Sequence, residues 1–390
     1  MDFGLTAEQR AFRDTAREFS DREFAPHAAR WDAEQVFPRD TIERAGALGF
    51  CALYAPEAIG GMGLPRLDSS IVLEELARGC TSTTAYITIH NMALWMIATF
   101  GSEDAKATFG PGLVSGARLA SYCLTEPNAG SDAASLRTVA RKDGDCYRMT
   151  GTKAFISGGG DTDVLVVMAR LADRSGVHEG AGGICSFAVP ADSPGVSFGR
   201  KEAKMGWNSQ PTRQIVFDDV EVPSAYRLGS EGEGFKIAMR GLDGGRINIA
   251  TCSVGAAQAA FDAASSYLRE RRQFGQALAS FQGLQFRLAD MATDLVAARN
   301  MVRMAAWKLD HGDPEATMYC AMAKRFATDA GFDICNQALQ LHGGYGYLKE
   351  FPLERHVRDT RVHQILEGTN EVMRVIISRR LLMEQAVELV

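Results

Sequence analysis

The stretch "LQFRLADMATDLVAARNMVRMAAWKL", residues 284–309, carries the strongest structural signal in the chain. Its apolar side chains recur every three or four residues, the spacing of one helix face. These positions are Leu284, Leu288, Met291, Leu295, Ala298, Val302, Ala305 and Leu309. A seam of this length packs against other long helices. Because Pro314, Gly343–Gly346 and Pro352 divide the rest into about three more helices, the pattern predicts a four-helix bundle within residues 229–390.

The N-terminal region, residues 1–116, has the same helical periodicity. Thr6 is a candidate N-cap, and Gln9 three residues later would complete a capping box. The segments "DSSIVLEELARGC" and "STTAYITIHNMALWMIATFG" predict two further helices. The second segment is apolar on most sides, so we expect that helix to be buried.

The middle region, residues 117–228, consists of short β-rich runs interrupted by Gly, Pro and Asp. Examples are "DCYRMTGTKAFIS", "DVLVVMAR" and "QIVFDDVEVP". Their spacing favours a small antiparallel sheet or barrel over βαβ units. A chain of 390 residues is long enough for two or three domains. The sequence therefore predicts a mainly α protein with a central antiparallel β domain.

Composition excludes several classes of function. The net charge of −6 gives no electrostatic reason to expect nucleic acid or an acidic membrane as partner. Eight cysteines are present without a C-x-x-C pair, which indicates isolated thiols rather than a zinc or redox site. No segment reaches the roughly 18 apolar residues of a membrane span. The N-terminus lacks a targeting pattern, so we expect a cytoplasmic protein, or a mitochondrial matrix protein if the chain is a processed eukaryotic one.

Phosphate-loop and dinucleotide-binding motifs are missing, so a nucleotide cofactor would have to be held in another way. Two polar stretches are candidates. In "YCLTEPNAGSDAASL", Thr125 and Ser131 could bind a polar heterocycle or form an ordinary turn. In "KAFISGGG", Phe155 and Ser157 lie two residues apart, so one strand face would offer a ring and a hydroxyl. A plain strand end is the alternative.

Three further stretches are ambiguous alone. In "RGLDGGRINIA", Asp243 and Arg246 lie one helical turn apart, as a solvated ion pair or as ligand contacts. The two glycines between them weaken a helix by about 1 kcal/mol each, which suggests a close approach of backbone or ligand. "RERRQFG" is a basic helix end or a pyrophosphate clamp, and "LQLHGGYGYLKEFPLERHVRD" is a helix end or a binding loop without metal-ligand spacing.

The stretch "QILEG" places Glu367 between the apolar pair Ile365–Leu366 and the helix-breaking Gly368. Such a carboxylate is either a solvated loop residue or a base in the wall of an apolar pocket. Apolar neighbours would raise its pKa by desolvation, closer to working pH.

Six motifs occur together and in register: "CLTEPNAGSD", "KAFISGGG", "GLDGGR", "RRQFG", "LQLHGGYGY" and "ILEGTNEVMR". Over essentially its whole length the chain resembles the acyl-CoA dehydrogenases, and "KMGWNSQPTRQIVFDDVEVP" resembles most the branched-chain members that oxidise isobutyryl-CoA in valine breakdown. The resemblance implies FAD, an acyl-CoA substrate, electron-transfer flavoprotein as electron acceptor and a homotetramer. It also implies a helical domain (1–116), a β domain (117–228) and a helical bundle (229–390).

The resemblance also assigns roles to individual residues. Glu367 would be the catalytic base. The FAD contacts would be Tyr122, Leu124, Thr125, Ser131, Phe155, Ile156, Ser157, Thr369 and Glu371, with Arg271, Phe274, Gln282, Gln340, Leu341, Gly343 and Gly344 serving the FAD of a neighbouring subunit. The substrate contacts would be Ser131, Asp243, Arg246, Leu366, Gly368 and Arg379. No metal site is implied.

The implied reaction removes an α-proton from the thioester and transfers the β-hydride to flavin. The isovaleryl branch of the family places its base where this chain has Gly245, which leaves Glu367 for the role. Three alternatives remain: another short or 2-methyl-branched acyl-CoA dehydrogenase, an acyl-CoA oxidase-like flavoenzyme, and a catalytically silent flavin- or CoA-binding scaffold.

Overall fold

The structure is a computed structural model that describes residues 4–173, 176–383 and 389. Its N-terminal part is helical, as expected, and Thr6 and Gln9 form the predicted capping box at the start of the first helix. The second predicted helix, α5, is almost entirely buried. The helices are α1 (Ala7–Phe19), α2 (Ala28–Glu34), α3 (Arg39–Ala47), α4 (Arg66–Gly79), α5 (Thr81–Phe100) and α6 (Glu103–Val114).

The middle part is one sheet whose strands, within the described residues, are β1 (Ala120–Cys123), β2 (Val139–Asp143), β3 (Cys146–Ser157), β4 (Val164–Asp173), β5 (Gly176–Val177), β6 (Ile184–Pro190), β7 (Val196–Phe198), β8 (Thr212–Pro223) and β9 (Arg227–Leu228). The order is β7-β8-β3-β2-β4-β6-β9, and β1 and β5 both pair with β4. Most pairs are antiparallel, but β1 and β2 run parallel to β4, so the sheet is mixed. Alternating hydrophobicity identifies a strand but not its direction, which is why sequence reasoning missed these parallel pairs.

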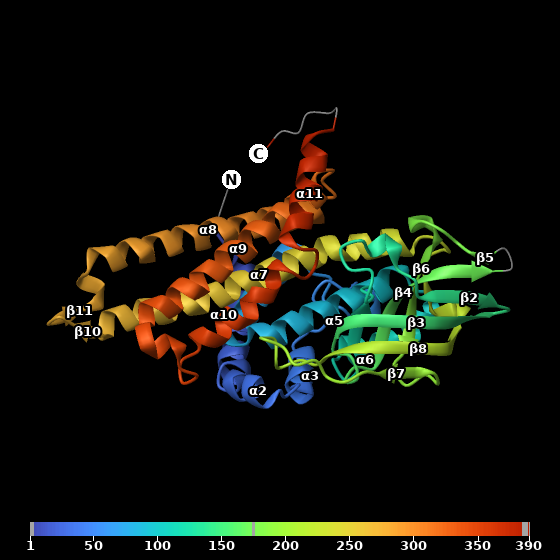
Figure 1. Cartoon of the computed structure of the whole chain (residues 1–390), viewed down its shortest axis with the longest axis horizontal. Helices are drawn as coiled ribbons and strands as arrows, with labels where there is room; N and C mark the ends of the chain where they lie inside the picture. Colours follow the sequence, from blue (N-terminus) through green and yellow to red (C-terminus); the bar gives the residue numbers. More distant parts are fainter. Residues whose placement is uncertain (1–3, 174–175, 384–388, 390) are drawn as a thin grey trace.

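The C-terminal part contains α7 (Gly234–Glu270), α8 (Gln282–Asp310), α9 (Ala316–His342), α10 (Leu353–Arg361) and α11 (Asn370–Leu381), with the ribbon β10 (Arg272–Gln273) and β11 (Gln276–Ala277) between α7 and α8. The predicted seam is confirmed, because its central side chains from Met291 to Ala305 are buried in α8. Helices α7, α8 and α9 lie side by side over most of their length (Figure 1). The helical–β–helical fold class is therefore as predicted.

The sheet and the β10–β11 ribbon lie at opposite ends of the molecule, and α7 runs from one end toward the other (Figure 1). Helix α5 packs against α7 and also against β1, so it joins the two helical parts to the sheet. Within the described residues, none of the helices combines the length and apolar character needed to cross a membrane.

Candidate active site

Glu367 lies in the loop of residues 364–370, which connects α10 and its terminal turn to α11. The residue as a whole is partly exposed, but its Oε2 atom is buried and has no hydrogen-bond partner. The carboxyl group rests against α7 at Gly245. A Cβ atom at Gly245 would lie 2.4 Å from Glu367 Oε2 and 3.0 Å from its Cδ. The glycine therefore makes the room that the carboxylate occupies.

Burial raises the pKa of Glu367 to about 7, and the nearby cations Arg246 and Lys324 oppose that rise. This is the desolvation expected from the apolar neighbours in the sequence. A carboxylate with such a pKa is populated in both protonation states near neutral pH, which suits a general base. The site therefore has an acceptor for a proton in a position where water is largely excluded.

Asp243 and Arg246 form an ion pair on α7, with 2.5 Å between Asp243 Oδ1 and Arg246 Nη1. The pair is buried rather than solvated, and Thr317 Oγ1 of α9 donates a 2.7 Å hydrogen bond to the other oxygen of Asp243. Arg246 Nε is buried without a partner. One edge of this guanidinium is thus available to a ligand or to bound water.

The two glycines between Asp243 and Arg246 do mark close approaches, as their cost to the helix suggested. Gly245 faces Glu367, and a Cβ at Gly244 would lie 2.4 Å from Nη1 of Arg66. Arg66 enters from α4, is 8% exposed, and stacks over the Tyr54 ring at 3.4 Å. Sequence reasoning missed Arg66, because an arginine at a helix start is ordinarily solvated.

The β domain contributes a second wall. Tyr122 on β1 has a buried hydroxyl without a partner, and both burial and the charge of Glu367 raise its pKa well above the ordinary value. The adjacent Ser121 donates a 2.7 Å hydrogen bond to the carbonyl of Ser157 at the end of β3. The structure thus places Tyr122 near Glu367 and attaches strand β1, which carries Tyr122, to the end of β3.

Phe155 has a φ of 57° at a β-bulge between Lys153 and Ile156, and its side chain is 70% exposed. A positive φ is strained for a bulky residue, and such strain gathers at functional sites. An exposed aromatic ring held this way is suited to contact a flat ligand. Among the other residues predicted to contact FAD, Ile156 and Leu124 are buried and Thr125 is partly buried.

Sequence reasoning also missed the buried ion pair between Lys153 and Glu126, whose Nζ and Oε1 lie 2.8 Å apart. Lys153 Nζ also donates to the carbonyl of Leu124, and the amide of Ala154 donates to the carbonyl of Thr125. These bonds tie the loop after β1 to the bulge in β3. The sequence feature that could have indicated this pair is a lysine within a predicted strand, between residues expected to be buried.

A second group of predicted FAD contacts lies at the other end of the molecule, around the β10–β11 ribbon and the end of α9 (Figure 1). Arg271, Gln340, Leu341, Gly343 and Gly344 line one hollow of about 440 Å³. Phe274, 91% exposed, and the exposed Gln282 belong to the same end. Within one chain, the fold does not bring this group together with Phe155 and Ser157.

The remaining predicted contacts are dispersed. Thr369 is the N-cap of α11 and accepts a hydrogen bond from the amide of Val372. Glu371 and Arg379 are exposed on α11, and Ser131 is exposed in the connection between β1 and β2. Leu366 packs on a small buried cluster that includes Trp207 and Ile249.

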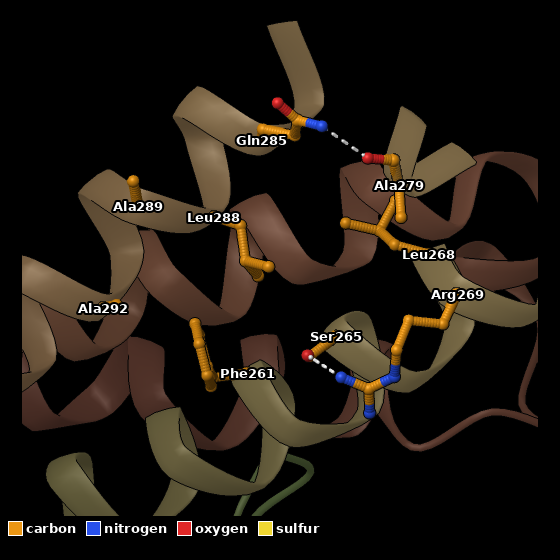
Figure 2. Close-up of a pocket in the computed structure, with 9 residues that line it drawn as sticks. All are labelled: Phe261, Ser265, Leu268, Arg269, Ala279, Gln285, Leu288, Ala289 and Ala292. Carbon is orange, nitrogen blue, oxygen red and sulfur yellow. Dashed lines mark hydrogen bonds between the residues drawn. The ribbon is translucent and has the colours of Figure 1, made fainter. Parts of the chain in front are cut away.

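A further hollow, of about 360 Å³, lies between α7 and α8 (Figure 2). Its described lining is mostly apolar and includes Phe261, Leu268 and Leu288, while Gln285 donates to the carbonyl of Ala279 and Arg269 donates to Ser265 Oγ. The residues lining it include no carboxylate or histidine, so it offers no general base.

The chain belongs to the acyl-CoA dehydrogenase family, because its residues 6–117, 121–220 and 232–382 match the family's N-terminal, middle and C-terminal domains. It is therefore an FAD-dependent oxidoreductase that acts on an acyl-CoA.

Similar proteins support that assignment. The chain is 55% identical over 381 residues to the mitochondrial isobutyryl-CoA dehydrogenase of Bos taurus, covering 98% of this chain and 90% of the relative. The structure of butyryl-CoA dehydrogenase from Megasphaera elsdenii superposes with a TM-score of 0.94, at 40% identity, over 98% of this chain and all of the other. A chain from a study of the electron transferring flavoprotein of Acidaminococcus fermentans superposes equally well, at 41% identity over the same shares of the two chains.

The residues present fit the cofactor of the family. An exposed aromatic ring at Phe155, a strand-end serine at Ser157 and an unpartnered buried hydroxyl at Tyr122 offer a flat surface and polar groups to an isoalloxazine ring. Bound FAD supplies the acceptor for a hydride.

Proposed function

We propose that the protein oxidises isobutyryl-CoA to methacrylyl-CoA, the α,β-dehydrogenation of valine breakdown, and that Glu367 is the base. The identity to isobutyryl-CoA dehydrogenase supports the substrate. The buried, unpartnered Oε2 of Glu367 beside Gly245 is the single observation that carries the role of the base. Since Gly245 has no side chain, the position used by the isovaleryl branch cannot supply a base here.

In this proposal Glu367 removes the proton from the α-carbon, and its carboxylate becomes a carboxylic acid. The negative charge that develops on the thioester oxygen needs a preorganised donor, and the backbone N–H of Glu367 would supply it by analogy with the family. Leu366 and Gly368 flank the acyl group. Bound FAD would supply the acceptor for the hydride of the β-carbon, so one proton and one hydride account for both hydrogens.

The cofactor and the substrate would be held by separate sets of residues. Tyr122, Leu124, Thr125, Ser131, Phe155, Ile156, Ser157, Thr369 and Glu371 would contact FAD. Ser131, Asp243, Arg246 and Arg379 would contact the CoA portion. The buried Asp243–Arg246 pair supports this assignment, because Arg246 keeps an unpartnered Nε.

The test is anaerobic reduction of the flavin by isobutyryl-, 2-methylbutyryl-, butyryl- and isovaleryl-CoA. We expect isobutyryl-CoA to bleach the flavin absorbance fastest in the wild-type protein, and E367Q to slow bleaching at least 1,000-fold while retaining FAD. Near-wild-type bleaching by E367Q would remove Glu367 from the mechanism. Faster reduction by another acyl-CoA would reassign the substrate, and no reduction by any of them would indicate a silent scaffold.

We also propose that the protein is a homotetramer in which each FAD site uses two chains. A neighbour's FAD would be served by residues around the β10–β11 ribbon and the end of α9, because that ribbon lies at the opposite end of the molecule from the sheet (Figure 1). These residues are Arg271, Phe274, Gln282, Gln340, Leu341, Gly343 and Gly344. Helix α8 exposes Phe286, Val296 and Trp307, which a neighbouring chain could cover. Light scattering of the holoenzyme measures the mass directly.

We further propose that the protein has three domains, with the limits 1–116, 117–228 and 229–390. We also propose that it works in the cytoplasm, or in the mitochondrial matrix if the chain is a processed eukaryotic one. Electron-transfer flavoprotein is the expected acceptor, and the similarity to the chain from the Acidaminococcus fermentans study supports it. Turnover with that acceptor should exceed turnover with oxygen by at least 100-fold. The opposite result would identify an acyl-CoA oxidase-like enzyme.

A further inference from the structure

Lys324 is a fully buried lysine in the middle of α9, next to the loop of residues 364–370. Its Nζ donates hydrogen bonds to the carbonyl of Gly368, at 2.7 Å, and to Oδ1 of Asn370, at 2.9 Å. Burying an ammonium group is unfavourable unless it is paired. The residue that follows Glu367 is therefore bonded directly to a buried cation.

The loop is attached to α9 at three points. Gln364 Nε2 and Asn370 Nδ2 both donate to Oδ1 of Asp329, each at 2.8 Å, and Lys324 holds the carbonyl of Gly368 between them. The first two bonds fix the ends of the loop. Within the described residues, the bond from Lys324 is the only side-chain hydrogen bond to the backbone at Glu367–Gly368, the part that determines where the carboxyl group points.

That part of the loop has an unfavourable backbone. Glu367 has a φ of 54° and Gly368 a φ of 86°, so two successive residues are left-handed. Such a conformation costs of order 1–3 kcal/mol for a residue other than glycine and persists only where its surroundings fix it. A charged donor on the Gly368 carbonyl is the strongest kind of hydrogen bond available for that purpose.

The charges around Glu367 come from several elements. Arg246 on α7 and Lys324 on α9 favour its ionised form, and Tyr122 on β1 and Tyr54 before α4 feel its charge. Lys324 in turn is faced by Glu367, Asp329, Arg246 and Glu371, and burial lowers its pKa to about 8. Lys324 is therefore mostly charged at neutral pH.

We propose that Lys324 is a positioning residue: its ammonium group, through the Gly368 carbonyl, holds the Glu367 carboxylate and backbone N–H in the reactive orientation and favours the ionised base. The inference rests on the proposed role of Glu367. It goes beyond that role by assigning a function to a lysine that is fully buried and bonded to the loop rather than exposed in the site.

The test compares K324M, K324Q and wild-type holoenzyme by flavin reduction with isobutyryl-CoA from pH 6 to 9. In K324M we expect the limiting rate to fall about 10- to 100-fold, as misplaced catalytic groups do, with a change in KM below threefold. Because a nearby cation is lost, the acidic limb of the rate profile should move to higher pH. K324Q retains a hydrogen-bond donor for the Gly368 carbonyl but has no charge. Its acidic limb should therefore move as far as that of K324M, while its limiting rate should fall less than that of K324M.

Lys204 provides a matched control. It is a half-buried lysine whose pKa burial likewise lowers to about 8, and it donates to the Gln210 carbonyl and Thr212 Oγ1 in the β domain. K204M should lose stability without moving the acidic limb. An unmoved limb with a rate within twofold of wild type, in K324M or in K324Q if K324M fails to fold, would overturn the inference. E367Q, tested separately, reports on the base itself.

Discussion

At the scale of single residues, the site depends on the fit between the side chain of Glu367 and Gly245, which has no side chain. Glu367 has a strained φ of 54°, its carboxyl group fills the space at Gly245, and its Oε2 has no hydrogen-bond partner. Each of these features is unfavourable for stability. They are explained together if the carboxylate is kept desolvated to receive a proton.

Replacing Gly245 by alanine should impair the reaction without unfolding the protein. The new Cβ would come within 2.4 Å of Glu367 Oε2, so the carboxyl group must move. We expect at least a 10-fold loss in the rate of flavin reduction with FAD content unchanged. G110A is the matched control, because its Cβ would meet only Ile59 Cβ, at 3.9 Å, within α6. A rate for G245A equal to that of G110A would contradict the proposed geometry.

The raised pKa of Glu367 also predicts how stability depends on pH. The folded protein binds the proton of the Glu367 carboxyl group more tightly than the unfolded chain does. The stabilisation that this proton gives the folded state is therefore complete below about pH 4.5 and is lost as pH rises through about 7. E367Q has no carboxyl group to ionise at this position, so the variant does not lose stability in this way as the pH rises. At pH 8 the variant should therefore exceed wild type in unfolding free energy by about 3 kcal/mol, and at pH 4 the two should be nearly equal. Urea unfolding at both pH values measures the difference, and equal stabilities at pH 8 would show that Glu367 is not desolvated.

At the scale of elements, buried ionic contacts set the two loops that meet at the site. The Lys153–Glu126 pair joins the loop after β1 to the bulge in β3, and Lys324 joins the loop before α11 to α9. In each case a regular element supplies the lysine and an irregular segment is held by it. The irregular segments are the ones that carry Thr125 and Glu367.

Breaking the pair in the β domain should cost more than a surface salt bridge would. E126Q leaves Lys153 buried and charged without its partner, which destabilises a protein by about 3–5 kcal/mol. The double variant E126Q/K153M removes the charge and should recover much of that loss. Thermal unfolding of the single and double variants tests this prediction. A loss in E126Q below about 1 kcal/mol, typical of exposed pairs, would contradict it.

Sequence patterns predicted some of these elements well and others poorly. The apolar side chains from Leu284 to Leu309 keep helical spacing over the whole segment, and that pattern indicates only a helix, so α8 could be predicted. The parallel pairing of β1 and β2 with β4 could not, because strand direction depends on how the connections cross. The motif around Glu367 could be recognised by resemblance, but Arg66, Lys153 and Lys324 could not. Only the fold shows that these three charges are buried.

At the scale of the whole molecule, the proposed FAD contacts on the β domain and those around the β10–β11 ribbon belong to parts that lie at opposite ends of the molecule (Figure 1). A single chain would then hold parts of two different sites. In the proposed tetramer, assembly is a condition for cofactor binding, a property that can be measured without knowing the substrate.

Mixed assemblies should restore an active site from two defective chains. E367Q lacks the base but keeps Arg271, while R271E keeps the base but carries the wrong charge for a neighbour's FAD. Each variant alone should be inactive or nearly so. When the two are unfolded and refolded together, the sites formed by the base of R271E and the far end of E367Q should be intact. We expect about a quarter of wild-type flavin reduction if chains mix at random and site halves pair independently. No activity above that of either variant alone would mean that each chain binds FAD by itself.

Helix α7 has a length that matters for this arrangement. It is continuous from Gly234 to Glu270, with Gly245 against the carboxyl group of Glu367 and Tyr267 in the hollow that also contains Arg271. The 22 residues from Gly245 to Tyr267 span roughly 33 Å at 1.5 Å per residue. In the proposed tetramer, the helix therefore sets the spacing and the angular phase between one site and the next. One inserted residue would turn the far end by about 100°, so the proposed tetramer constrains the length of α7 between these two points.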